Sequence, residues 1–416
     1  MNILENKTFC VMPWMNISVD PDGSVKPCCI SKQHIKKEDG TPYNLGYDKV
    51  EDIVNSPEYV SIREKMIKGE KIDSCVQCYK VEEYSNTQSK RYLYNLNWLP
   101  KPEILNKIKQ GSVIESTVYD FDLRFGNLCN LSCRSCIPVN SSQMEKELLE
   151  LADTTNIKKF FQVTTHEDIN DWYETERFDE NIKRSIDTIR QLYITGGEPT
   201  IIKKNFEILE YLVQTGKSNN IRLVFNSNMT NLNSQFYELL SHFETVIFYA
   251  SIDGYGEIQE YLRYPSAWSQ VDKNIIKLVS MGSKIMIRPS PVVQIGNLNR
   301  LTELFEYFEN FNRIHGKSLI SVWPNILEFP SHLNIIHLPL EYKKMCWDRI
   351  EEWIDAKCKY QDKMFHSRIQ GLKNKCIVDA YNPEEVAKFF EMNEIFDNHR
   401  KHYLKDINPE LYALRA

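Results

Sequence analysis

The chain has 416 residues, a formal net charge of −6 and a pI of about 5.9, so it lacks the basic surface that binds nucleic-acid phosphates. No run of about 18 apolar residues could span a membrane, and the first eight residues lack the features of a secretory signal. Eleven cysteines without an export signal favour metal ligation over disulfides. We therefore expect a cytoplasmic, metal-binding protein with more than one structural unit.

Residues 1–95 form a cysteine-rich opening unit. Two short runs, 17–19 and 24–26, flank Pro21-Asp-Gly23 and predict a β-hairpin. Mixed helices and strands are therefore expected in this small α+β unit.

Helix signals follow the hairpin. Ser56 and Pro57 predict the first turn of a helix, with serine as the N-cap, and Gly69 predicts its end. A further helix is expected from Cys78 through Tyr92. Residues 96–116 contain Pro100 and Pro102 and are expected to be a linker.

Short strands alternate with helices from 117 to 335. Because strands separated by helices pair in parallel, this pattern predicts an α/β fold with a partial (β/α)6-type barrel. The chemistry of such a barrel lies at the C-terminal ends of its strands. Residues 336–416 are rich in aromatic and charged side chains and are expected to form a helical extension. The expected strands cover residues 118–125, 191–195, 221–225, 245–251, 284–288 and 319–323.

Three cysteines follow the first barrel strand with the spacing Cys-x3-Cys-x2-Cys: Cys129, Cys133 and Cys136. Three such thiolates can hold three irons of a [4Fe–4S] cube and leave the fourth iron open. An open coordination position makes a metal site reactive. The alternatives are a zinc knuckle or buried, inert thiols, but the next histidine that could complete a zinc site is His166.

The second barrel strand ends in Thr195-Gly-Gly-Glu-Pro199. Two glycines allow the backbone to approach a ligand closely, and Glu198 offers a carboxylate at the mouth of the barrel. Together with the cysteine spacing and the order of strands, this motif resembles the radical S-adenosylmethionine (SAM) superfamily. The resemblance covers about residues 117–300.

The resemblance implies a set of SAM contacts at the strand ends. The Gly-Gly-Glu-Pro motif would bind the amino group of SAM, the polar residues of the third and fourth strand ends its ribose or carboxylate, an arginine its carboxylate, and a valine its adenine. Polar residues at strand ends can alternatively cap the next helix. The superfamily often has an aromatic residue before the third cysteine, but this chain has Ser135, so that adenine contact is not carried over. The implied residues are Gly196, Gly197, Glu198, Pro199, Asn226, Ser227, Ser251, Arg263 and Val293.

A second set of cysteines lies upstream of the barrel. Cys10 and Cys28, together with Cys75-x2-Cys78, supply four thiolates, enough to close a second cube. The pattern is similar to the Twitch or SPASM auxiliary modules of the superfamily, with Pro13-Trp14 and Gly23 as supporting landmarks. Such modules normally follow the barrel, whereas here the unit precedes it. A structural zinc site built from the same four cysteines is the alternative.

The remaining cysteines are not expected to bind metal. Cys29 is adjacent to Cys28, and neighbouring side chains point apart. Cys346, Cys358 and Cys376 have no ligand spacing and are expected to be ordinary helix cysteines.

The expected organisation is an auxiliary [4Fe–4S] module at 1–95, a linker at 96–116, a radical SAM barrel at 117–335 and a helical extension at 336–416. The resemblance implies an oxidoreductase or maturase that cleaves SAM to a 5′-deoxyadenosyl radical and abstracts hydrogen from a substrate. The auxiliary cluster would accept an electron, so that a peptide or protein side chain is oxidised or crosslinked. A reductant such as flavodoxin or ferredoxin is an expected partner, and neither generic nucleic acid nor a membrane is.

Two alternatives stay open. One is radical SAM chemistry on a small molecule or a nucleoside, and the other is a non-catalytic iron–sulfur or zinc protein. No catalytic acid or base is assigned, because the polar residues expected to line the barrel are also candidates for the fold core. These residues are Asp122, Arg124, Arg288, Trp323 and Glu328.

Overall fold

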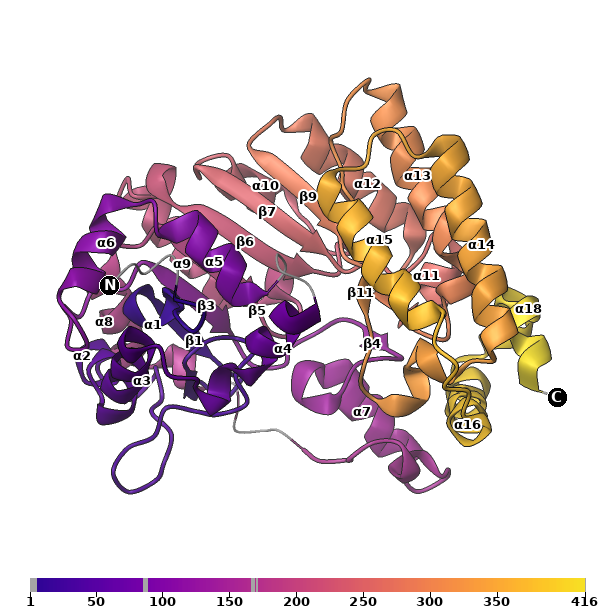
Figure 1. Cartoon of the computed structure of the whole chain (residues 1–416), viewed down its shortest axis with the longest axis horizontal. Coiled ribbons are helices and arrows are strands. Elements are labelled where there is room, and N and C mark those ends of the chain that lie inside the picture. The colour runs from indigo at the N-terminus through magenta and orange to yellow at the C-terminus, as the bar shows by residue number, and fades with distance from the viewer. Residues whose placement is uncertain (1–5, 85–88, 166–168, 170, 416) are drawn as a thin grey trace.

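The computed structural model describes residues 6–84, 89–165, 169 and 171–415. Its centre is a seven-stranded sheet in the order β2-β1-β3-β5-β6-β7-β9 (Figure 1). The five strands from β3 to β9 all run parallel, which confirms the α/β architecture. They are β3 (Asp120–Arg124), β5 (Gln191–Thr195), β6 (Arg222–Ser227), β7 (Thr245–Ala250) and β9 (Ile285–Pro289).

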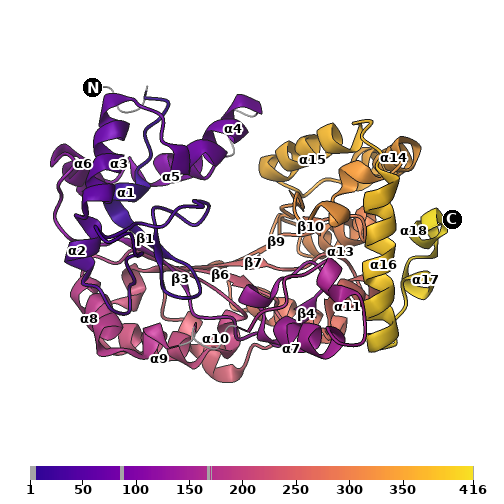
Figure 2. The same cartoon turned by 90° about the horizontal axis from the view of Figure 1, so that it is seen from below.

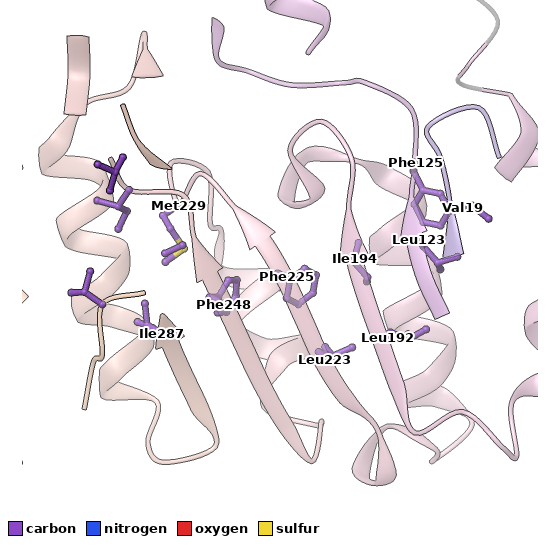
Figure 3. Packing of buried hydrophobic residues seen from close by; sticks show 14 of the residues in the cluster. Val19, Leu123, Phe125, Leu192, Ile194, Leu223, Phe225, Met229, Phe248 and Ile287 are labelled. Carbon is purple, nitrogen blue, oxygen red and sulfur yellow. The ribbon is translucent and has the colours of Figure 1, made fainter. Parts of the chain in front are cut away.

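Alternation along each strand separates an apolar face of the sheet from a polar one. On β3, Phe121 and Leu123 are fully buried under the helices, and Phe225 of β6 stacks on Phe248 of β7 with 5.3 Å between ring centroids. Figure 3 shows this apolar face. The helices after the strands are α7 (Ser142–Leu151), α8 (Glu176–Ser185), α9 (Lys203–Gln214), α10 (Ser234–Leu240), α11 (Glu257–Leu262), α12 (Trp268–Ser280) and α13 (Leu301–Ile314).

The N-terminal unit joins the same sheet. β1 (Asn16–Val19) pairs in parallel with β3 and antiparallel with β2 (Val25–Lys26), which confirms the predicted hairpin. Ser18 lies opposite Asp122 in the register. The cysteine-rich unit is therefore continuous with the barrel through its backbone hydrogen bonds.

The helices of this unit match the local signals in part. Ser56 accepts a hydrogen bond from Tyr59 N–H at the start of α3 (Pro57–Lys68), and Gly69 ends it at φ +79°, as predicted. The other helices are α1 (Met12–Met15), α2 (Val50–Val54), α4 (Val76–Tyr84), α5 (Lys90–Trp98) and α6 (Pro102–Lys109).

The single helix expected from Cys78 through Tyr92 is instead two helices, α4 and α5. The Ser89 hydroxyl accepts from Tyr92 N–H and so caps a new helix, while residues 85–88 lie outside the described part of the chain. Residues 96–116, expected as a linker, contain α6, whose Ile104 and Ile108 are buried.

The sixth expected strand, 319–323, is reduced to one parallel bridge between Ile287 and Ile320. Proline has no N–H to donate to a ladder, and Pro289, Pro291 and Pro324 interrupt the pairing here. The chain instead pairs further on, where β10 (Val292–Val293) runs parallel to β11 (Asn325–Ile326).

The C-terminal extension is helical, as expected, and no helix among the described residues is both long and apolar enough to span a membrane. Figure 2 shows α14 and α15 over the face of the sheet opposite α8, α9 and α10. The helices of this extension are α14 (Leu340–Lys357), α15 (Lys363–Cys376), α16 (Pro383–Arg400), α17 (Leu404–Ile407) and α18 (Pro409–Tyr412).

Helix α16 clamps the cysteine loop. Arg134, between two of the three cysteines, is 1% exposed and forms a 2.7 Å ion pair with Asp397. Its guanidinium lies 3.7 Å from the ring centroid of Tyr261. Arg400 pairs with Glu147 at 2.6 Å and donates to the Ser132 carbonyl at 2.7 Å. Two buried arginines thus tie the loop to the C-terminal helix.

We expect Asp397→Ala to lower the free energy of unfolding by about 3–5 kcal/mol, because it leaves the buried Arg134 guanidinium without its carboxylate. Urea unfolding followed by circular dichroism measures the change. Glu410→Ala removes the exposed partner of Arg349 and is the control, with an expected loss below about 1 kcal/mol. Equal losses in the two variants would contradict the clamp.

Candidate SAM and iron–sulfur site

The cysteine loop follows β3 and contains a short strand that pairs with a strand from later in the chain. β4 (Ser132–Cys133) pairs antiparallel with β8 (Arg263–Tyr264), which sets Cys133 opposite Arg263. Cys129 and Cys133 are buried, and Cys136 is half-buried. The Leu131 N–H donates to Cys129 Sγ at 3.5 Å. The loop therefore gathers three sulfurs at the C-terminal edge of the sheet.

Burial is the main influence on these thiols. Burial and the neighbouring Cys133 together raise the pKa of Cys129 to about 12. The pKa of Cys136 is raised in the same way by burial, Cys133 and Cys129. Because metals bind the thiolate form, three crowded buried thiols require a cationic partner to ionise together. This donor set fits the iron of a cluster.

A cavity of about 340 Å³ opens beside the three cysteines. This volume lies within the usual range of small-molecule sites, roughly 300–1,000 Å³. Thr195 lines this cavity, and its hydroxyl is buried without a hydrogen-bond partner. The lining residues are Arg124, Cys129, Leu131, Cys133, Cys136, Asn140, Thr195, Gly196, Gly197, Glu198, Asn226, Asn228, Ser251 and Arg263.

The structure therefore brings together the three cysteines and six of the nine residues expected to contact SAM. Pro199, Ser227 and Val293 do not line the cavity. Val293 is fully buried in the core, and its burial there overrides the expected place in an adenine pocket.

The structure gives a reason for glycine at positions 196 and 197 that does not involve a ligand. A Cβ on Gly197 would lie 1.9 Å from the Leu128 carbonyl oxygen, and Gly196 has φ +92° with its backbone against Phe125. The Glu198 N–H donates to the same Leu128 carbonyl at 2.7 Å. The close approach is thus to the chain's own cysteine loop, and it holds that loop against β5.

Glu198 does not offer its carboxylate at the mouth. The side chain is 1% exposed, and four donors from three residues saturate it. The Thr200 hydroxyl donates at 2.7 Å and the Ser227 hydroxyl at 2.8 Å to Oε1, which also accepts from Thr200 N–H, while Asn228 N–H donates to Oε2 at 2.7 Å. Glu198 therefore joins the ends of β5 and β6.

Arg263 lies between an acid and a cysteine. Its Nε forms a 2.8 Å ion pair with the fully buried Asp253, and its Nη1 lies 3.8 Å from Cys133 Sγ. Asp253 and Cys133 raise the pKa of the guanidinium, although burial opposes them. A fixed positive charge thus lies beside one thiol at the wall of the cavity.

Several lining residues were missed from the sequence. Asn228 donates through Nδ2 to Asn130 Oδ1 at 2.8 Å, which links β6 to the cysteine loop. The stretch Asn226-Ser-Asn228 ends a strand, and side-chain alternation would have put Asn226 and Asn228 on one face. Asn140, Leu131 and Thr195 carried no comparable signal.

The upstream cysteines also converge. Cys10 and Cys78 are buried, while Cys28 and Cys75 are half-buried. Burial raises the pKa of Cys10, and the other three cysteines raise it further, so all four lie close enough to interact. The pKa of Cys28 and that of Cys75 are each raised to about 11, mainly by burial. Four thiols around one centre fit the full ligation of a cube.

Helix α5 positions the first of these cysteines. Arg91 Nη1 donates to the Phe9 carbonyl at 2.7 Å, and Asn95 Nδ2 donates to the same oxygen at 2.9 Å. Asn95 Oδ1 accepts from Val11 N–H at 2.8 Å. The backbone on both sides of Cys10 is therefore fixed from the helix that follows Cys78.

Cys29 faces the other way, toward the polar face of the sheet. Besides burial and Cys28, the charges that act on it are those of Lys90, Asp122 and Arg124. Arg124 also lines the cavity at the three cysteines, and its Nη2 lies 3.5 Å from the Cys29 carbonyl oxygen. One side chain thus touches both cysteine regions.

Across the described ranges, no three His, Cys, Asp or Glu side chains approach closely enough to hold one metal ion. The ligands of a cube bind different irons, so a cube does not require three side chains that meet at one ion.

The fold and these two cysteine groups define an iron–sulfur protein with a barrel site and an auxiliary site. Residues 123–292 match the model of the radical SAM superfamily, and residues 10–79 match SPASM, an iron–sulfur cluster-binding domain. The chain is a radical SAM protein with a SPASM-type module ahead of its barrel. Its cofactors are SAM, a SAM-binding [4Fe–4S] cluster and an auxiliary iron–sulfur cluster.

Solved structures match this chain only at low sequence identity and low TM-score. The anSMEcpe structure with bound AdoMet and Cp18Cys peptide is 14% identical, with a TM-score of 0.33, over 57% of this chain and 60% of that one. Streptococcus suis SuiB bound to S-adenosylmethionine is 13% identical, with a TM-score of 0.35, over 78% and 65%. The match spans less than two thirds of each of these proteins. Curated protein sequences gave no match.

We expect about eight irons per chain after anaerobic reconstitution, the number in two cubes. The variant Cys129→Ala/Cys133→Ala/Cys136→Ala is expected to keep about four, and so is Cys75→Ala/Cys78→Ala, because each removes one ligand set. Iron and sulfide analysis measures the counts. Cys29→Ala is the matched control and is expected to keep all the iron; a loss there would contradict the assignment of Cys28.

We expect Glu198→Gln to weaken SAM binding by about 10- to 100-fold, because the amide group cannot accept from all four donors and the ends of β5 and β6 separate. Equilibrium dialysis of labelled SAM against the reconstituted protein measures the affinity. Glu207→Gln, on the outer helix α9, is the control. If the Glu198→Gln variant bound SAM with unchanged affinity, Glu198 would not position the SAM site.

Proposed function

We propose that this protein is a radical SAM oxidoreductase or maturase that oxidises or crosslinks a peptide or protein side chain. The observation that carries the proposal is the single cavity that gathers the three cysteines, the glycine-rich end of β5 and Arg263. A [4Fe–4S] cluster on Cys129, Cys133 and Cys136 and an auxiliary one on Cys10, Cys28, Cys75 and Cys78 are part of the proposal.

When bound, these groups supply a 5′-deoxyadenosyl radical and an acceptor for one substrate electron. The residues of the chain would position SAM, place a positive charge beside the cluster and exclude water from the site. Gly196, Gly197 and Glu198, together with Asn226, Ser251 and Arg263, line the SAM cavity and would contact the amino acid and ribose parts of SAM. Pro199 directly follows this lining and would hold its backbone in place. Ser227 acts through Glu198, to which it donates a hydrogen bond.

The pairing of β1 with β3 supports a role for the auxiliary cluster. It joins the four-cysteine unit to the strand that leads into the three-cysteine loop. Arg124, at the end of that strand, contacts the Cys29 carbonyl and also lines the cavity at the three cysteines. Loss of one hydrogen atom from the substrate, followed by loss of a proton and one electron, is a two-electron oxidation. An acceptor held at a fixed place near the barrel suits that second electron.

The layout of the helices supports a peptide or protein substrate. In Figure 2, α4 and α5 on one side and α14 and α15 on the other rise over the polar face of the sheet. Two separate helical units therefore offer surface to a chain that reaches the barrel. A small molecule or nucleoside is the second candidate, which the experiment below distinguishes.

We expect the reconstituted, reduced protein to convert SAM to 5′-deoxyadenosine, and Cys133→Ala to lower the rate at least about 100-fold, because it removes one cluster ligand. Mass spectrometry under anaerobic conditions measures the nucleoside. Cys358→Ala is the matched control. Absence of 5′-deoxyadenosine from a protein that holds a full, reduced cluster would favour the non-catalytic alternative.

Hydrogen transfer identifies the substrate class. Deuterium-labelled extracts, split by ultrafiltration, are supplied to the enzyme, and the deuterium content of 5′-deoxyadenosine is measured. We expect label from the peptide and protein fraction, and none from that fraction after protease digestion to amino acids. Label from the small-molecule fraction alone would overturn the peptide assignment.

A further inference from the structure

A row of aromatic side chains leads away from the SAM cavity along the polar face of the sheet. The Tyr193 hydroxyl donates to Asn226 Oδ1, a cavity residue, at 3.0 Å. The rings of Tyr193 and Tyr249 lie 6.5 Å apart, and those of Tyr249 and Trp323 lie 5.8 Å apart. All three side chains are half-buried. The row therefore connects the cavity to Trp323.

Two arginines contact the same indole at the far end of this row. The Arg288 guanidinium, from β9, lies 4.3 Å from the Trp323 ring centroid, and that of Arg368, from α15, lies 5.0 Å from it. Arg288 also donates to the Tyr249 hydroxyl at 3.2 Å, and Arg368 donates to Asn325 Oδ1 at 2.6 Å. Strand β9 and helix α15 of the C-terminal extension thus both contact the Trp323 ring.

Neither guanidinium has an acidic partner. Among the described residues, no ion pair includes Arg288 or Arg368. The acid that acts on Arg368 is Asp362, whose carboxylate accepts from Phe365 N–H as the cap of α15. Burial and the charge of Arg288 lower the pKa of Arg368. Two like charges therefore face one ring with no carboxylate to balance them.

Donors without acceptors lie at the same place. Trp323 Nε1 and Arg368 Nε are both buried with no hydrogen-bond partner. An unsatisfied buried donor is costly, so this corner of the fold lacks acceptors as well as negative charge. An oxyanion bound at the two guanidinium groups would supply the missing charge. The planar guanidinium group matches a carboxylate especially well.

We propose that Arg288, Arg368 and Trp323 form a subsite for a carboxylate of the peptide substrate. The inference rests on the proposed function and narrows its substrate class to peptides with an acidic group near the modified side chain. The carboxylate belongs either to an Asp or Glu side chain or to the peptide's C-terminus, and the experiment separates the two.

The test is anaerobic selection of random heptapeptides on the reconstituted, SAM-loaded enzyme. One library has amidated C-termini and the other has free C-termini. Enrichment of Asp or Glu in the amidated library identifies a side-chain carboxylate, whereas preference for the free-acid library without such enrichment identifies the C-terminus. Absence of both preferences in the wild-type enzyme overturns the proposal.

Variants tie the preference to the subsite. We expect Arg288→Gln and Arg368→Gln each to weaken binding of a selected peptide by about 10- to 100-fold, and the Lys variants to restore part of it. Arg368 lies on α15 outside the sheet, so its replacement leaves the strand pairing in place. Arg313→Gln, on the outside of α13, is the control. Unchanged binding in a folded, iron-loaded Arg368→Gln variant overturns the proposal.

The outcome is separable from that of the proposed function. Wild-type SAM cleavage is measured on the same preparation. If 5′-deoxyadenosine forms but peptides show no acidic preference, only the subsite fails. If acidic peptides are selected but no 5′-deoxyadenosine forms under reduction, the proposed function fails and the carboxylate site stands.

Discussion

The parallel pairing of β1 with β3 is the contact on which the arrangement of both cysteine regions depends. β3 runs directly into the loop with Cys129, Cys133 and Cys136, and β1 with its hairpin leads to Cys28. Because the two strands share backbone hydrogen bonds, the cysteine groups are fixed relative to one another by the stiffest part of the fold. The polar residues between them, the buried Asp122 and the half-buried Arg124, belong to β3 itself.

The walls of the cavity are held in place by contacts between protein residues. The Glu198 carboxylate accepts hydrogen bonds that join the ends of β5 and β6, and the absence of a side chain at Gly197 lets its backbone contact Leu128. The residues that line the cavity besides the cysteines include the two glycines, Asn226, Ser251 and the positively charged Arg263. Rigid donors of this kind are already in place before a ligand arrives, which lowers the cost of ordering on binding.

Features set by neighbouring residues could be predicted from the sequence, and features set by distant contacts could not. The hairpin at Pro21-Asp-Gly23, the cap at Ser56 and the parallel strands follow from local chemistry and were confirmed. The direction of the Glu198 carboxylate depends on Ser227 and Asn228 of another strand, so the motif alone pointed the wrong way. The broken sixth strand required the joint effect of prolines on two segments, and the burial of Val293 depends on packing that no local pattern reports.

The clamp of α16 on the cysteine loop also sets an order of events during synthesis. The loop at 129–136 leaves the ribosome more than 250 residues before Asp397 and Arg400, its buried partners. Since chains fold from the N-terminus as they emerge, the loop lacks its buried partners on α16 for that whole interval. The contacts that fix the backbone of the cysteine loop are thus completed last, after every ligand cysteine has been made.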